Sequence, residues 1–225
     1  INENLKIMIL RAVPDGDEYD KDVALAIRYA VDNGAKIINT SFGKEYSPHK
    51  EWVWGALKYA EEKDVLIISA AGNGSSNIDP GKTETYITDF DNGEEIVSNF
   101  LSVGASTYDY DKNQLASFSN FGKENVDIFA PGDKIWSCTP GEKFDFLSGT
   151  SMAAPNASFV AAILRSIFPK LSARETKLIL MKSGIPIYYD ILIPDSSRHS
   201  DPIELSKSGK LINLYNALIM GSKKK

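Results

Sequence analysis

The chain has 225 residues, enough for one large domain with a substantial buried core. Its hydrophobic content of 43% and charged content of 24% are those of an ordinary globular protein. The formal net charge is −5, and no basic stripe is interleaved with aromatic residues, so nucleic acid is not an expected partner. The most apolar stretch, residues 65–72, is too short to span a bilayer, so no membrane span is expected.

Apolar runs and helix-period stripes alternate along the first seventy residues. The expected elements are a strand over 5–10, a helix over 23–31 that ends near 33–34, a strand over 36–40, a helix with an apolar stripe over 53–60, and a strand over 65–69. Ser47 and Pro48 are expected to be the N-cap and first-turn residues of the second helix. Strands and helices that alternate at this spacing predict right-handed crossovers and a parallel sheet.

The second part of the chain begins with residues 72–99, which are polar and rich in turn formers, and we expect a long surface excursion there. The elements expected after it are strands over 100–105 and 126–130, a hairpin over 135–139 and 143–147, helices over 151–167 and about 172–183, a terminal helix near 211–219 and a solvated tail over 223–225. We expect a single domain over 1–225, with a core over about 5–185 and a C-terminal extension over about 186–225.

The stretch "GTSMAAP" at residues 149–155 places Ser151 where a strand passes into a helix. Its neighbours are small and leave the hydroxyl uncovered. A helix N-terminus offers free N–H groups and a partial positive charge, which suit an anion that forms beside this serine. Taken alone, Thr150 or Ser151 would simply cap the helix. The seven-residue context favours a reactive serine.

This stretch, within "FLSGTSMAAPNAS" at residues 146–158, closely resembles the nucleophile motif of the subtilisin-like serine proteases. Four other stretches resemble motifs of that family in the right order: "INTSFG" at 38–43, "ISAAGNG" at 68–74, "ASFSNFG" at 116–122 and "DIFAPG" at 127–132. The resemblance covers roughly residues 5–185 and looks closest to cell-envelope subtilases of the Bacteroides type. It implies an α/β, three-layer subtilisin-like fold, with a mostly parallel sheet flanked by helices and with its N-terminal strands missing.

The resemblance also implies a function, a serine endopeptidase that hydrolyses peptide bonds through an acyl-enzyme on Ser151. Asn73 matches the oxyanion-hole asparagine, whose neutral amide donates to the oxyanion without attracting the base. In the family, the edge that matches Ser41, Phe42 and Gly43 pairs with an extended polypeptide substrate. The other substrate-binding positions expected from these motifs are Ala70, Ala71, Gly72 and Thr150. Export or a location in the cell envelope is expected from the resemblance alone.

A serine nucleophile needs a base, which in this family is a histidine oriented by an aspartate. Neither His49 nor His199 has the sequence setting of that base, and the acidic pair Asp15 and Asp17 does not match the aspartate motif. Because the chain starts at Ile1 without an initiator Met, we expect a cut edge and an upstream segment of the same protein that carries both residues. The chain alone is then expected to be inactive. The competing hypothesis is a pseudo-protease or peptide-binding module that keeps the fold without activity.

No cofactor and no metal site are predicted. Calcium is a common accessory in these proteases, and Asn77, Asp79, Asp89 and Asp91 could lend it oxygens, but their spacing fits no calcium-loop pattern. An acidic surface insertion is the preferred interpretation. The glycine-rich residues 72–74 are not followed by Gly-Lys-Ser/Thr, so a nucleotide-binding α/β domain is not favoured.

Overall fold

The computed structural model describes residues 5–14 and 16–224. Asp15, the expected cut edge at Ile1 and the last tail residue, Lys225, lie outside the described residues. The helices are α1 (Asp20–Asp32), α2 (Lys50–Glu62), α3 (Thr150–Ile167), α4 (Ala173–Ser183), α5 (Leu214–Ser222) and the 3₁₀ turn η1 (Pro202–Glu204). The strands are β1 (Ile37–Thr40), β2 (Leu66–Ala70), β3 (Phe90–Asp91), β4 (Glu94–Glu95), β5 (Phe100–Ser106), β6 (Ile128–Pro131), β7 (Ile135–Thr139), β8 (Lys143–Leu147), β9 (Ile185–Pro186), β10 (Ile191–Leu192), β11 (His199–Ser200) and β12 (Lys210–Leu211).

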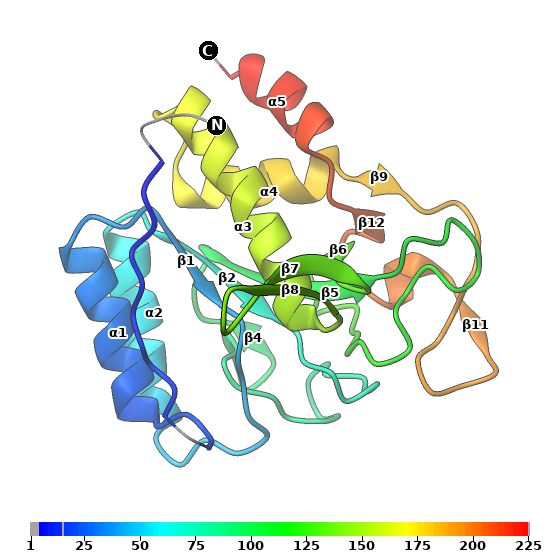
Figure 1. Cartoon of the computed structure of the whole chain (residues 1–225), viewed down its shortest axis with the longest axis horizontal. Coiled ribbons are helices and arrows are strands. Elements are labelled where there is room, and N and C mark those ends of the chain that lie inside the picture. Colours follow the sequence, from blue (N-terminus) through cyan, green and yellow to red (C-terminus); the bar gives the residue numbers. More distant parts are fainter. Residues whose placement is uncertain (1–4, 15, 225) are drawn as a thin grey trace.

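The main sheet has six strands in the order β1-β2-β5-β6-β12-β9. All neighbours in it are parallel except β12 and β9, which are antiparallel. Parallel neighbours need a crossover, and α2 supplies the one between β1 and β2 (Figure 1). Because β12 lies between β6 and β9, residues 186–225 contribute a strand to this same sheet.

Strand β2 is buried on both faces, and its alternate residues pack against different helices. Ile67 belongs to the core beneath α1 and α2, whereas Leu66 and Ile68 belong to the core beneath α3 and α4. This alternation follows from the two-residue period of a strand, and burial on both faces explains the continuous apolar run. Figure 1 shows the pair α1 and α2 separated from α3 by the strands. The expected three-layer, mostly parallel α/β fold is confirmed.

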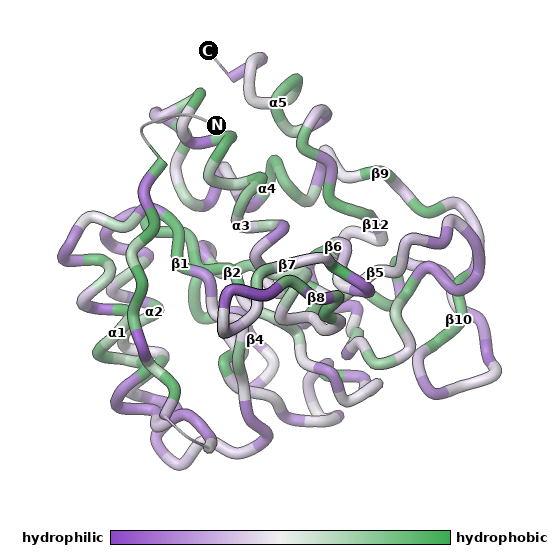
Figure 2. The backbone as a smooth tube through the Cα atoms, in the orientation of Figure 1, coloured by the Kyte–Doolittle hydropathy of each residue, from purple (hydrophilic) through white to green (hydrophobic). Residues whose placement is uncertain are grey.

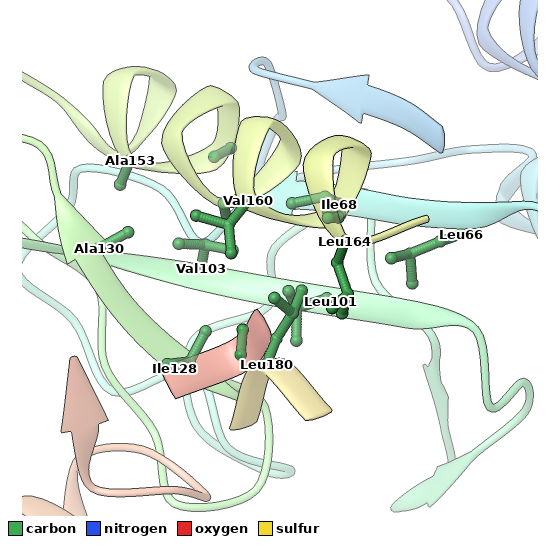
Figure 3. Close-up of a cluster of buried hydrophobic side chains, with 14 of the residues drawn as sticks. Leu66, Ile68, Leu101, Val103, Ile128, Ala130, Ala153, Val160, Leu164 and Leu180 are labelled. Atoms are coloured by element: carbon green, nitrogen blue, oxygen red, sulfur yellow. The ribbon is translucent and has the colours of Figure 1, made fainter. Parts of the chain in front are cut away.

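The core beneath α3 fixes the position of that helix on the sheet. Figure 3 shows Val160 and Leu164 directed from α3 toward Val103 and Leu101 of β5. Leu164 is fully buried, and burial of a leucine side chain contributes about 1.5–3 kcal/mol. Ala153, also fully buried, lets the first turns of α3 approach the sheet closely. Because α3 packs on the sheet along its whole length, the position of its first turn is fixed.

The strand expected over residues 5–10 is wrong, because these residues have no regular secondary structure. Ile7 is 91% exposed and Ile9 is 88% exposed. A strand needs a neighbour to pair its backbone N–H and C=O groups, and within the described residues no strand lies beside this segment. Figure 2 colours much of this N-terminal stretch as hydrophobic. The outer edge of β1 likewise pairs with no strand in the part of the chain that the structure describes.

Two other expectations need correction. Helix α2 begins after His49, and Ser47 is not its N-cap, because the Ser47 hydroxyl donates instead to the buried carboxylate of Asp20 at 2.7 Å. The excursion over residues 72–99 lies only partly at the surface, since Ile78 and Val97 are buried and the hairpin β3–β4 forms within it. A polar composition concealed the few apolar residues that dock this segment. The hairpin β7–β8 and the capping box of α4 are confirmed.

An ion cluster, of which Asp89, Asp127 and Lys177 are buried, joins the excursion to the sheet and to α4. It consists of Asp89, Glu95, Asp127, Lys177 and Lys207. Lys177 Nζ lies 3.2 Å from Asp127 Oδ1 and 3.6 Å from Glu95 Oε1. Burial raises the pKa of Asp89 to about 7, and the ammonium of Lys177 only partly opposes this shift. Asp89 therefore takes up its proton on folding at pH values where the unfolded chain does not.

We predict that Asp89 makes the stability of the chain depend on pH. Because its pKa is higher in the folded state, the free energy of unfolding should fall as pH rises from about 4 to about 7, with a slope of up to about 1.4 kcal/mol per pH unit. Asp89→Asn should flatten this dependence in urea unfolding between pH 4 and 8. Asp190→Asn, at an exposed site, is the control and should leave the slope unchanged. An unaltered slope in Asp89→Asn would contradict the prediction.

Candidate active site

Three chain segments meet at one end of the main sheet. Two follow the carboxyl ends of the neighbouring strands β1 and β2, and the third is the first turn of α3. In parallel α/β sheets, the carboxyl ends of the strands are the usual place for a binding or catalytic site. Here they bring Ser41, Asn73 and Ser151 together, although 110 residues separate the first from the last.

The side chain of Asn73 is oriented by Thr150. Asn73 Oδ1 accepts hydrogen bonds from the backbone N–H of Thr150 at 2.8 Å and from its Oγ1 at 2.9 Å. Since a backbone N–H can only donate, the atom that faces it is the amide oxygen, and Nδ2 remains as a donor. Thr150 Oγ1 also accepts from the N–H of Gly72 at 3.0 Å. The fully buried Thr150 thus ties the loop after β2 to the first turn of α3.

Gly149 precedes this turn in a conformation that favours glycine, with φ +156° and ψ 160°. A Cβ at this position would also lie 3.4 Å from Asn73 Nδ2. The N–H of Gly149 donates to the carbonyl of Gly132 at 2.8 Å, which connects the turn to the end of β6. The "DIFAPG" stretch therefore supports the turn that carries Ser151, through this hydrogen bond.

Ser41 and Ser151 exchange two hydrogen bonds. Ser151 Oγ donates to the carbonyl of Ser41 at 3.0 Å, and Ser41 Oγ donates to the carbonyl of Ser151 at 2.9 Å. The second bond is possible because Pro155 has no N–H and cannot make the helical bond to the carbonyl of Ser151. A proline four residues after the serine thus frees the acceptor that holds Ser41.

The Ser151 hydroxyl has no basic side chain as a hydrogen-bond partner in the described residues. It donates a hydrogen bond to a backbone carbonyl, which is too weak a base to remove the proton, and no side chain in the described residues accepts this hydrogen bond. The backbone N–H of Ser151 is in the first turn of α3, where such groups have no helical acceptor. A Cβ on Gly149 would lie 3.4 Å from Asn73 Nδ2 and 3.6 Å from the backbone nitrogen of Ser151, so these two donors are close to each other. Two neighbouring donors of this kind can stabilise a developing oxyanion.

Neither histidine contributes to this constellation. The ring of His49 stacks on Trp52 at a centroid distance of 4.1 Å, and its Nδ1 lies 3.5 Å from Glu51 Oε1 at the start of α2. His199 is exposed in the small antiparallel pair β10–β11. The structure therefore does not bring either ring to Ser151.

The expected substrate-binding residues lie on the two strand ends. Phe42 packs against the core of α1 and α2, Ala71 is buried, and Ala70 packs against the α3 core. Sequence reasoning missed two residues that lie next to these strand ends, Thr85 and Tyr86. A Cβ on Gly43 would lie 2.6 Å from the carbonyl of Tyr86, and one on Gly72 would lie 3.9 Å from Thr85 Oγ1.

Thr85 and Tyr86, which belong to the excursion over residues 72–99, therefore lie next to the two strand ends. Tyr86 is held in place by Lys44, with which it exchanges two backbone hydrogen bonds of 2.7 and 2.8 Å. No sequence signal indicates this placement, because it depends on how the excursion folds back over the strand ends.

Two of the four side chains suggested for calcium, Asp79 and Asp89, face other groups. The carboxylate of Asp79 already accepts backbone N–H groups of Lys123, Glu124 and Asn125 at 2.8–3.1 Å. Asp89 belongs to the ion cluster around Lys177. Within residues 5–14 and 16–224, no group of three or more His, Cys, Asp or Glu side chains is placed to hold a metal ion.

Known proteins resemble this chain in sequence and in fold. A curated relative, the thermophilic serine proteinase of Bacillus sp. strain AK1, is 38% identical over 166 residues, which are 72% of this chain and 36% of that protein. The cell wall-associated protease of Bacillus subtilis strain 168 is 35% identical over 214 residues, 92% of this chain and 22% of that protein. The chain therefore spans between about a fifth and about a third of the length of these two relatives.

Other relatives include an extracellular serine protease of Natrialba magadii and the major intracellular serine protease of Bacillus subtilis. In the described part of the chain, no helix is long and apolar enough to cross a membrane. Among solved structures, the prenylagaramide maturation protease PagA matches with a TM-score of 0.69 and 28% identity, over 90% of this chain and 68% of that one. Residues 1–209 match the subtilase family, peptidase family S8, and the chain belongs to that family.

Proposed function

We propose that this chain is the portion of a serine endopeptidase that carries the nucleophile, Ser151, and one oxyanion donor, Asn73. The observation that supports this most directly is the pair of hydrogen bonds from Thr150 to Asn73 Oδ1, because it leaves Nδ2 available beside the serine. Ser41, Phe42 and Gly43 on one side, and Ala70, Ala71 and Gly72 on the other, would bind an extended polypeptide substrate, with Thr150 as support.

In the proposed reaction, Ser151 Oγ attacks the carbonyl carbon of the scissile bond while its proton passes to a base. Asn73 Nδ2 and the N–H of Ser151 stabilise the oxyanion of the tetrahedral intermediate. The C–N bond then breaks, the leaving amine takes the proton from the base, and an acyl ester forms on Ser151. Water repeats the attack on the ester, which releases the acid and regenerates the serine.

The base and its orienting acid are proposed to come from an upstream segment of the same protein. Neither His49 nor His199 contacts Ser151 in the described structure. The outer edge of β1 and the exposed apolar side chains of Ile7 and Ile9 are surfaces that additional strands could cover. The competing function is a pseudo-protease or peptide-binding module, which would keep the substrate-binding residues but would have no catalytic base.

Export to the cell envelope is also a proposal. It is supported by the cell wall-associated relative, which matches most of this chain, while an intracellular relative supports the opposite location. The finer resemblance to Bacteroides-type envelope subtilases remains a prediction. Fractionation of the producing cells, followed by detection of the protein in envelope and cytoplasm, tests both.

We predict that the purified chain of residues 1–225 shows little or no peptide hydrolysis, because no described side chain can accept the proton of Ser151. The full-length protein should hydrolyse a denatured protein substrate and be labelled at Ser151 by a fluorophosphonate. Full-length protein that stays unlabelled would favour the pseudo-protease. Robust hydrolysis by residues 1–225 that survives both His49→Ala and His199→Ala would contradict the proposed source of the base.

Asn73→Ala in the full-length protein should lower kcat by about 10²–10³, the loss that removal of one oxyanion-hole donor causes in a subtilisin-type site. KM should change little, because the donor acts on charge that develops after substrate binding. Steady-state kinetics with a chromogenic peptide measures both constants. A rise in KM at unchanged kcat would assign Asn73 to substrate binding alone.

Thr150→Val keeps the size of the side chain and removes the hydroxyl that links Gly72 to Asn73. The free energy of unfolding should fall by about 1–3 kcal/mol, because the partly buried N–H of Gly72 loses its acceptor. In the full-length protein kcat should also fall. Thr150→Ser, which retains the hydroxyl, should restore most of both quantities in urea unfolding and kinetics, and a failure of this rescue would contradict the hydrogen-bond role.

A further inference from the structure

The loop that carries Asn73 is held by the side chain of a second asparagine, Asn120. Asn120 Oδ1 accepts from the N–H of Gly74 at 2.9 Å and from the N–H of Ser76 at 3.0 Å, and its Nδ2 donates to the carbonyl of Ala71 at 2.9 Å. One side chain therefore satisfies three backbone groups, on both sides of Asn73. Asn120 is 6% exposed, so water cannot readily replace it in these bonds.

An amide is the side chain that suits this position. The two N–H groups need an acceptor with two lone pairs, and the carbonyl of Ala71 needs a donor, which a carboxylate cannot supply. The backbone leaves little room, since a Cβ on Gly72 would lie 2.4 Å from Asn120 Nδ2. Gly72, with φ +100°, thus allows the loop to close around the amide.

Asn120 is itself anchored to the sheet. Its backbone N–H donates to the carbonyl of Gly72 at 2.9 Å, and its carbonyl accepts from Ser119 Oγ at 2.8 Å. Ser119 Oγ in turn accepts from the N–H of Ala105 in β5 at 2.9 Å. These bonds connect the loop to a fully buried strand, so the position of the loop is set by β5 as well as by β2.

We propose that Asn120 is a positioning residue for the oxyanion donor: it fixes the backbone on both sides of Asn73 so that the amide of Asn73 points to the oxyanion beside Ser151. Thr150 orients the Asn73 side chain, while Asn120 locates the backbone from which that side chain extends. This inference rests on the proposed function, because the position of Asn73 matters for rate only if Ser151 is a nucleophile.

The test compares Asn120→Asp with a matched control, Asn99→Asp, in the full-length protein. Asn99 is also buried, and its Nδ2 donates to the carbonyl of Val65 at 2.6 Å, at the opposite end of β2. Both substitutions place a carboxylate beside a backbone carbonyl, but only one lies beside the Asn73 loop. Asn73→Ala is measured alongside, with peptide hydrolysis, fluorophosphonate labelling and urea unfolding for every variant.

Asn120→Asp should lower kcat by about 10- to 100-fold and change KM by less than about threefold. The reason is that a displaced Asn73 amide should lose part of the oxyanion stabilisation that is lost completely when the amide is removed. Asn99→Asp should lower stability while kcat stays within about threefold of wild type. In hydrogen exchange on residues 1–225, the amides of 72–76 should exchange at least about tenfold faster in Asn120→Asp and not in Asn99→Asp.

Three results would overturn the proposal. If kcat is unchanged in Asn120→Asp while Asn73→Ala has lost activity, Asn120 does not position the donor, although the proposed function stands. If Asn120→Asp and Asn99→Asp lose kcat equally, the effect is general destabilisation. If the wild-type protein is neither active nor labelled, the proposed function itself fails, and the positioning role fails with it.

Discussion

The site depends on the hydrogen bonds from Thr150 to the amide oxygen of Asn73. They connect the loop after a central strand with the first turn of the helix that crosses the sheet. Both elements are rigid, since β2 is buried on both faces and α3 is packed along its length. These bonds therefore position the amide more precisely than a loop alone would.

The other contacts of the site are made by backbone groups of α3 that have no hydrogen-bond partner within the helix. The N–H groups of the first turn of α3 have no helical acceptor, which leaves the N–H of Thr150 free to bond Asn73. In the proposed reaction, the N–H of Ser151 would bind the oxyanion for the same reason. Pro155 removes one more helical bond, and Ser41 uses the released carbonyl to join β1 to the same turn. The helix start thus organises two neighbouring strand ends through its unpaired backbone groups.

The two ends of β2 are held by the same chemical device, a buried asparagine. Asn120 binds the loop at the carboxyl end, and Asn99 donates to Val65 before the amino end. The ion cluster, which links the excursion to α4, adds a separate attachment. Stability and site geometry can accordingly be altered through different residues.

The sequence by itself determined the layers, the parallel sheet, the helix start at Ser151 and the family. These follow from local signals: a two-residue or 3.6-residue period of apolar side chains, and short motifs whose order is preserved. The capping box at Ser172 and the hairpin β7–β8 were predictable for the same reason.

Only the tertiary structure decided which groups partner across long sequence separations. The apolar run at residues 5–10 predicted a strand, but a strand exists only where a neighbour pairs its backbone, and none lies beside it in the described chain. Ser47 bonds Asp20 instead of capping α2, and Thr85, Tyr86 and Asn120 reach the strand ends through folding of the excursion and of the loop after β5. Such contacts depend on which surfaces meet in three dimensions, and the periodic pattern of apolar residues along the chain does not predict this.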